Sequence, residues 1–160
     1  MFGPVLKQFY IYTMDSKGRG MNKADVRILV IDDMQSVRST IKMILGGLGF
    51  KWIDEASDVP SAINQIKDAV QNKASYNLIF TDLVMNELLG TDVIKFCSED
   101  ARLKNIPFIV VTSEKDMDLL KPIIDMKVAG IILKPLTINE VQKKLEKIIM
   151  PLIASKRITF

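Results

Sequence analysis

The chain has one cysteine, Cys97, and no histidine among its 160 residues. A disulfide joins two cysteines, so none can form within the chain. Without histidine, zinc sites of the usual Cys/His type and nucleophilic Ser–His or Cys–His pairs are excluded as well. Free cysteine usually behaves as a small apolar residue, so we expect Cys97 to be half-buried on a helix.

Long apolar runs and a strong excess of one charge are also missing. No stretch approaches the roughly 20 apolar residues of a membrane span. Residues 1–12 are interrupted by Pro4 and Lys7 and lack a small-residue cleavage site, which argues against a signal peptide. Lys and Arg exceed Asp and Glu by only 22 to 19 and form no arginine-rich block. We therefore expect a cytoplasmic protein with no membrane insertion and no nucleic-acid partner.

Length and composition fit one domain with tails, since 48% of the residues are hydrophobic. We divide the chain into an N-terminal extension and linker over residues 1–26, a domain over 27–150 and a C-terminal tail over 151–160. Residues 5–12 have strong strand propensity, so the extension is either dispensable or buries this segment. The tail is too short for a further domain, and we expect a domain that stands alone.

From Arg27 onward, strand-like runs alternate with helical spacing. Near-continuous apolar runs are typical of parallel strands that are covered by helices on both faces. Strands are expected at residues 27–31, 51–56, 76–81, 108–111 and 131–133. Helices are expected at about residues 36–48, 60–70, 91–98, 115–125 and 139–149, with Ser57 or Asp58 as the cap of the second. Five such units predict a doubly wound α/β domain with a five-stranded parallel sheet.

Polar side chains follow four of these strands at their carboxyl ends. They are Asp32 and Asp33, Asp82, Thr112, and Lys134. Because parallel strands end at one edge of a sheet, these side chains are expected to lie close together there. Three neighbouring carboxylates repel one another, and a divalent cation would neutralise them. All-oxygen ligation selects Mg²⁺, for which Mn²⁺ can substitute.

Each of these motifs also has an ordinary structural interpretation. An Asp–Asp pair after a strand often forms a turn or caps a helix. Lys134 is harder to explain as a solvated charge, because it lies between an apolar strand and Pro135, but it suits an ammonium that reaches the acid cluster. A carboxylate nucleophile, a metal, a hydroxyl and a lysine together stabilise a transferring phosphoryl group. The set therefore predicts a phosphoryl-acceptor site.

The sequence resembles the receiver domains of two-component response regulators, in particular the single-domain chemotaxis type. The resemblance covers about residues 27–150 and is carried by ILVIDDMQSVR, NLIFTDLVM…GTDVIKF, PFIVVTSEKD and VAGIILKPLT. It implies a flavodoxin-like (βα)5 fold with strand order 2-1-3-4-5. It also implies a sensor histidine kinase or phosphotransfer protein as the phosphodonor, and a downstream protein target that the sequence does not identify. We therefore expect a phosphorylation-controlled signalling protein of phosphorelay signal transduction rather than an enzyme.

The resemblance assigns roles at the acid cluster. It implies that Asp82 is the phosphorylated aspartate. It further implies that Asp33 and Asp82 bind Mg²⁺ directly, that the backbone carbonyl of Val84 completes the protein ligands, and that Asp32 acts mainly through water.

The resemblance also implies how phosphorylation is reported. Thr112 and Lys134 would hold the phosphoryl oxygens, and Thr112 would move toward the phosphate. The Lys134–Pro135 peptide bond is expected to be cis. The surface that changes would comprise residues 115–125, 131–133 and 139–149. Ile131 stands where many receivers carry an aromatic switch residue, so it either packs simply or forms a tailored docking contact.

Other positions depart from the family pattern or stay open. Asn86 replaces a common proline, and Val84 stands where a polar side chain is frequent. Glu114 either caps the following helix or controls water access to the site. Within the family, the alternative is a phosphorelay intermediate or phosphate sink that passes phosphate to a histidine phosphotransfer protein. A Mg²⁺-dependent phosphatase is disfavoured because Val84 replaces the second acid that such enzymes need, and a phosphorylation-independent scaffold is disfavoured by the complete site.

Overall fold

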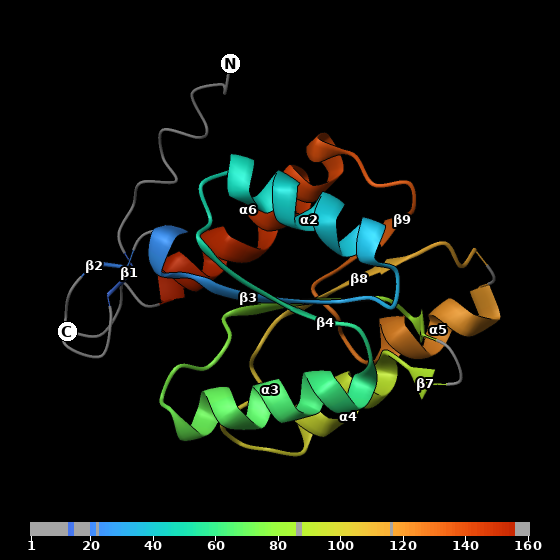
Figure 1. The fold of residues 1–160 in the computed structure, drawn as a ribbon, viewed down its shortest axis with the longest axis horizontal. Helices are drawn as coiled ribbons and strands as arrows, with labels where there is room; N and C mark the ends of the chain where they lie inside the picture. The colour runs from blue at the N-terminus through green and yellow to red at the C-terminus, as the bar shows by residue number, and fades with distance from the viewer. Residues whose placement is uncertain (1–12, 15–19, 22, 86–87, 116, 156–160) are drawn as a thin grey trace.

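The structure is a computed structural model that describes residues 13–14, 20–21, 23–85, 88–115 and 117–155. Its main body has three layers, in which a sheet lies between two layers of helices (Figure 1). The strands of the sheet are β3 (Arg27–Ile31), β4 (Trp52–Ala56), β5 (Leu78–Thr81), β8 (Phe108–Thr112) and β9 (Gly130–Leu133). They are all parallel, in the order β4-β3-β5-β8-β9. This arrangement confirms the expected α/β fold and the 2-1-3-4-5 strand order.

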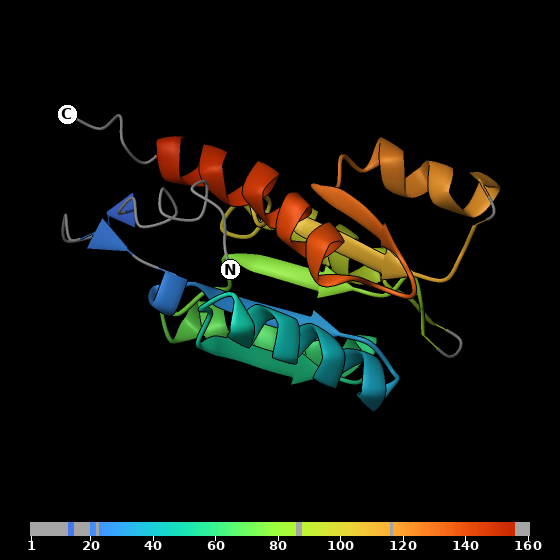
Figure 2. The same ribbon diagram turned by 90° about the horizontal axis from the view of Figure 1, so that it is seen from above.

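The helices divide between the two faces of the sheet. One face is covered by α2 (Gln35–Gly47) and α6 (Ile138–Ser155). The other face is covered by α3 (Val59–Gln71), α4 (Thr91–Ser98) and α5 (Met117–Asp125). The strands point the same way, so their carboxyl ends share one edge of the sheet (Figure 2).

The apolar runs of the sequence are explained by burial on both faces. In β3, Ile28 and Val30 pack toward α2 and α6, whereas Leu29 and Ile31 pack toward the opposite helices. All five residues of β8 are buried. Since successive side chains of a strand point to opposite faces, a strand covered on both sides needs apolar residues at every position. This requirement is what made the central strands recognisable in the sequence.

The extent of α6 and two short hairpins were not expected. The helix α6 continues through Pro151 to Ser155, beyond the tail boundary placed at residue 150. A proline inside a helix removes one backbone hydrogen bond and its ring crowds the carbonyl four residues earlier, so a helix end near Pro151 was expected, yet α6 continues past it. The hairpins pair β1 (Thr13–Met14) with β2 (Gly20–Met21), and β6 (Val84–Met85) with β7 (Leu88–Leu89).

The first hairpin changes the interpretation of the N-terminal extension. Residues 1–26 were expected to be an extension and linker, yet within them β1 pairs with β2 and lies against α6. The 3-10 helix η2 (Lys23–Asp25) then leads into β3. The aromatic segment 5–12 and Asn86 lie outside the described residues. Within the described residues, none of the helices combines the length and apolar character that a membrane crossing requires.

The structure also selects between the two candidate caps of α3. Asp58 is the N-cap, and its Oδ1 accepts a 2.7 Å hydrogen bond from the backbone N–H of Ser61. Ser57 instead donates its hydroxyl to Asp58 Oδ2 at 3.3 Å in an exposed position. The side chain of Asp58 therefore satisfies one of the free N–H groups at the start of the helix.

We predict that Asp58→Ala lowers the free energy of unfolding by about 1 kcal/mol, because the Ser61 N–H loses its acceptor. Ser57→Ala is the matched control and should change it by less than about 0.5 kcal/mol. Urea unfolding of the two variants, followed by circular dichroism, measures both values. Equal destabilisation by the two substitutions would contradict the assignment of the cap.

Candidate functional site

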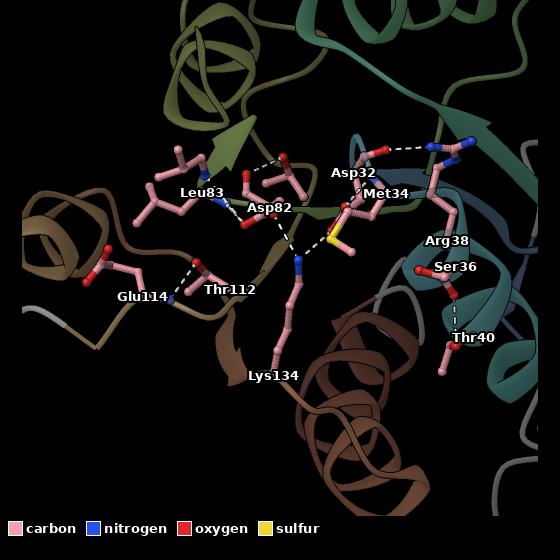
Figure 3. A network of polar contacts seen from close by, with 12 residues as sticks. Asp32, Met34, Ser36, Arg38, Thr40, Asp82, Leu83, Thr112, Glu114 and Lys134 are labelled. Atoms are coloured by element: carbon pink, nitrogen blue, oxygen red, sulfur yellow. Dashed lines mark hydrogen bonds and ion pairs between the residues drawn. The ribbon is translucent and has the colours of Figure 1, made fainter. Parts of the chain in front are cut away.

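The polar residues predicted from strand ends meet at the carboxyl edge of the sheet (Figure 3). Asp32 follows β3, Asp82 follows β5, Thr112 ends β8, and Lys134 follows β9. Backbone hydrogen bonds extend the parallel ladder to these positions. The N–H of Asp82 donates to Ile31 O at 2.9 Å, and the N–H of Lys134 donates to Thr112 O at 2.9 Å. The site therefore inherits its geometry directly from the sheet.

Lys134 joins two carboxylates that are far apart in the sequence. Its Nζ lies 2.9 Å from Asp32 Oδ2 and 2.9 Å from Asp82 Oδ2, as Figure 3 shows. The side chain of Lys134 is 15% exposed, and that of Asp32 is 1% exposed. This contact is the one that the sequence predicted for a lysine between an apolar strand and a proline. The Lys134–Pro135 bond is cis, as expected.

Asp33 completes an acidic cluster at the surface. Carboxylate oxygens of Asp32, Asp33 and Asp82 all lie within 4.8 Å of one another, with Asp33 exposed and the other two buried. Three carboxylates beside one ammonium leave an excess of two negative charges when all are ionised. A cluster of oxygen donors with this excess and one exposed member fits a hard divalent cation such as Mg²⁺.

Burial and ion pairing have opposite effects on the pKa values of Asp32 and Lys134. Burial raises the pKa of Asp32, because desolvation outweighs the hydrogen bonds from Lys134 and from the backbone N–H of Met34. Burial works to lower the pKa of Lys134, yet its hydrogen bonds to Asp32 and Asp82 outweigh this effect and raise the pKa overall. Lys134 is therefore charged at neutral pH and supplies a fixed positive charge at the site.

Backbone groups hold the carboxylate of Asp82. Its Oδ1 accepts hydrogen bonds from the N–H of Leu83 at 2.6 Å and of Val84 at 3.4 Å, while its Oδ2 faces Lys134. The hydroxyl of Thr81 donates to the carbonyl oxygen of Asp82 at 3.0 Å. A carboxylate held in this way loses little further freedom when it reacts.

Asp32 has a similar supporting set. Its Oδ1 accepts from the N–H of Met34 at 2.8 Å, and its carbonyl oxygen accepts from Arg38 Nη1 at 2.8 Å. Arg38 also forms an ion pair with Glu55 at 3.3 Å. The sequence interpretation did not single out Arg38, although its position in the first turns of the helix after Asp32 places it within reach of that strand end.

Gly90 was also missed by the sequence interpretation. It precedes α4, and its N–H donates to Leu83 O at 2.8 Å. A methyl group on Gly90 would overlap the carbonyl oxygen of Asp82 and would lie 2.8 Å from Thr81 Oγ1. Glycine is therefore needed here for close approach of two backbone segments. A glycine directly before the first residue of a predicted helix is the signal in the sequence that marks this position.

The remaining predicted residues lie around this centre. Thr112 is buried, and its hydroxyl oxygen accepts from the N–H of Glu114 at 3.1 Å. The carboxylate of Glu114 accepts from the N–H of Lys115 at 3.0 Å. Lys115 lies before α5, which begins at Met117, so this bond does not decide between the two interpretations of Glu114. Val84 lies on β6 with 44% of its surface exposed. Ile131 is half-buried and packs against the apolar cluster on the α3, α4 and α5 side of the sheet.

Comparisons with known proteins agree with this geometry. A family model described as the response regulator receiver domain matches residues 28–146. Chemotaxis protein CheY-3 of Vibrio cholerae is 31% identical over 80% of this chain and 94% of its own length. Chemotaxis protein CheY of Pseudomonas aeruginosa is 31% identical over 77% of this chain and 95% of its own. Among solved structures, a CheX–CheY–BeF3–Mg²⁺ complex from Borrelia burgdorferi has a TM-score of 0.68 at 21% identity, covering 78% of this chain and 89% of that chain.

We predict that Gly90→Ala lowers the free energy of unfolding by about 1–3 kcal/mol, because the added methyl group displaces Asp82 or α4. Gly46→Ala in α2 is the matched control, since a Cβ at Gly46 meets no atom within 4 Å. Alanine favours a helix interior over glycine, so the control should be neutral or stabilised by up to about 1 kcal/mol. Chemical unfolding of both variants decides the point, and a Gly90→Ala protein as stable as wild type would refute the close-approach argument.

Proposed function

The chain belongs to the response regulator receiver family, and we propose that it is a phosphorylation-controlled signalling switch. In this proposal Asp82 accepts a phosphoryl group from a sensor histidine kinase or phosphotransfer protein in a Mg²⁺-dependent reaction. The surface of α5, β9 and α6 then changes and regulates a downstream protein in the cytoplasm. The contact of one ammonium, Lys134, with both buried carboxylates beside exposed Asp33 is the observation that supports it best.

The transfer step follows from the groups around Asp82. A carboxylate oxygen of Asp82 forms the bond to phosphorus while the bond from phosphorus to the donor's histidine nitrogen breaks. The N–H groups of Leu83 and Val84 keep the carboxylate oriented during the step. Lys134 moves from pairing with carboxylates to pairing with a phosphoryl oxygen and offsets the added negative charge.

The acid cluster provides the ligands for Mg²⁺. Asp33 and Asp82 would hold the ion through their side chains, Val84 through its backbone carbonyl, and Asp32 mainly through water. When bound, Mg²⁺ supplies the positive charge that lets the carboxylate and the phosphoryl oxygens approach one another. One solved structure of the same fold contains Mg²⁺ together with a CheY protein, which supports the assignment.

The switch would run through β8 and β9. In the structure the hydroxyl oxygen of Thr112 accepts from the N–H of Glu114. In the proposed phosphorylated state the hydroxyl rotates and donates to a phosphoryl oxygen. The strand β9 would move together with Thr112, because the N–H of Lys134 donates to the carbonyl oxygen of Thr112 and Ile131 pairs with Val110 in register. Ile131 is only partly buried, so a small shift of β9 would change the surface that it shares with α5 and α6.

We predict that acetyl phosphate with Mg²⁺ adds one phosphoryl group to the protein, and that Asp82→Asn abolishes the adduct because the amide is not a nucleophile. Chelation of Mg²⁺ with EDTA should also prevent it. Asp92→Asn is the control, since Asp92 is exposed on α4 outside the acid cluster. Intact mass at low pH measures the adduct. An undiminished adduct on Asp82→Asn would overturn the assignment, and transfer of the group from Asp82 back to a partner histidine would favour a phosphorelay intermediate.

We also predict that Val84 prolongs the phosphorylated state. Hydrolysis needs a water aligned with the phosphorus atom, and valine at position 84 cannot hydrogen-bond that water. A single hydrogen bond contributes about 0.5–1.5 kcal/mol, so Val84→Asn should speed the decay of the phosphoprotein by roughly two- to tenfold. Val84→Ala controls for size, and Leu88→Asn controls for an added amide elsewhere on the same exposed hairpin. Decay after donor removal at fixed Mg²⁺ is the measurement; an unchanged or slower rate in Val84→Asn contradicts the prediction.

A further inference from the structure

A cavity lies at the other end of the sheet from the acid cluster. It is formed by the C-terminal part of α4, the segment that leads into β8 and the turn between α5 and β9, and it encloses about 280 Å³. Phe108 begins β8 here, whereas Thr112 ends the same strand at the acid cluster. The cavity is therefore separated from the phosphoryl-acceptor site by the length of the strand.

Nine of the thirteen residues that line the cavity are apolar. Its apolar lining residues are Ile94, Cys97, Leu103, Ile106, Pro107, Phe108, Met126, Val128 and Ala129. A buried thiol contributes to the apolar character, because burial raises the pKa of Cys97 to about 12 and keeps it protonated. Mostly apolar walls with a few polar groups are typical of sites for small molecules.

The charged lining residues of the cavity are both basic. They are Lys104 and Lys127, and no carboxylate is among the lining residues. In the part of the chain that the structure describes, neither ammonium forms an ion pair. The nearby carboxylate of Asp100 is already engaged by Arg102 at 2.6 Å. The amide of Asn105 adds a further hydrogen-bond donor to the lining.

The backbone at Lys127 is in a conformation that glycine usually adopts. Lys127 follows the end of α5 with φ at +56°, and Lys73 follows the end of α3 with φ at +53°. A left-handed residue at this position commonly ends a helix, and glycine adopts it at lower cost. Replacement of either lysine by glycine therefore removes an ammonium without straining the chain.

We propose that this cavity binds a small amphiphile with one carboxylate and a short apolar chain. The apolar walls would take the chain, and Lys104, Lys127 and Asn105 would pair with the carboxylate. A volume of 280 Å³ lies just below the range of about 300–1,000 Å³ that is typical of small-molecule sites, which limits the apolar part to a short chain. The proposal is independent of phosphorylation at Asp82.

The test is a titration of the full chain with sodium octanoate below its micelle concentration, followed by ¹H–¹⁵N spectra. We expect saturable shifts at residues 94–108 and 126–129, and no comparable effect from acetate or octylammonium. Each of Lys104→Ala and Lys127→Gly should weaken binding by roughly two- to fivefold, the usual range for an exposed ion pair. The double variant should weaken it further than either single variant, though not by the full product, because both lysines pair with one carboxylate. Lys73→Gly is the matched control and should bind octanoate as wild type does.

Several outcomes would overturn the proposal. Non-saturable shifts, shifts centred elsewhere, or equally tight binding of octylammonium would each exclude an anion-selective cavity. Equal octanoate affinity in the double variant and in Lys73→Gly would show that the two lysines do not recognise the carboxylate. Binding to phosphatidylglycerol vesicles without binding of octanoate would assign the lysines to a membrane surface instead of a small ligand.

Discussion

The contact of Lys134 with Asp32 and Asp82 is the interaction on which the site depends. Two carboxylates that are almost fully buried repel each other and lose hydration, so they need a positive charge within hydrogen-bond distance. Lys134 supplies that charge from a strand 52 residues beyond Asp82 in the sequence. In the proposed function the same contact would make the site responsive, because the ammonium that two carboxylates share would pair with a phosphoryl oxygen once Asp82 is phosphorylated.

The sheet makes this contact possible at little conformational cost. The strands β3, β5, β8 and β9 are in a fixed parallel register, and hydrogen bonds from Asp82 and Lys134 continue the ladder beyond the strand ends. The side chains of the acid site thus extend from a buried layer. Gly90 adds a second constraint, since its lack of a side chain lets the start of α4 approach the carbonyl of Asp82.

The two ends of the sheet differ in chemistry. Three aspartates and one lysine lie at the carboxyl end. The cavity at the opposite end of β8 is lined by apolar and basic residues and by no carboxylate. The helix α4 lies near both, because Gly90 at its start approaches the backbone of Asp82, while Ile94 and Cys97 line the cavity. One short element is therefore packed against both the acid site and the cavity.

The sequence alone determined the layered fold and the members of the acid site. Strands buried on both faces must be apolar throughout, and parallel strands deliver the residues that follow them to one edge, so Asp32, Asp33, Asp82, Thr112 and Lys134 could be found from their positions. The tertiary structure decided which cap α3 uses, how far α6 extends, that residues 13–14 and 20–21 pair, and that Arg38 and Gly90 support the site. It also decided that the hydroxyl of Thr112 accepts from the N–H of Glu114, and that a cavity with apolar walls and two lysines forms at the Phe108 end of β8. The features that only the tertiary structure decided depend on contacts between segments that are distant in sequence or on the packing of side chains. The local pattern of residue types carries little information about such contacts or such packing.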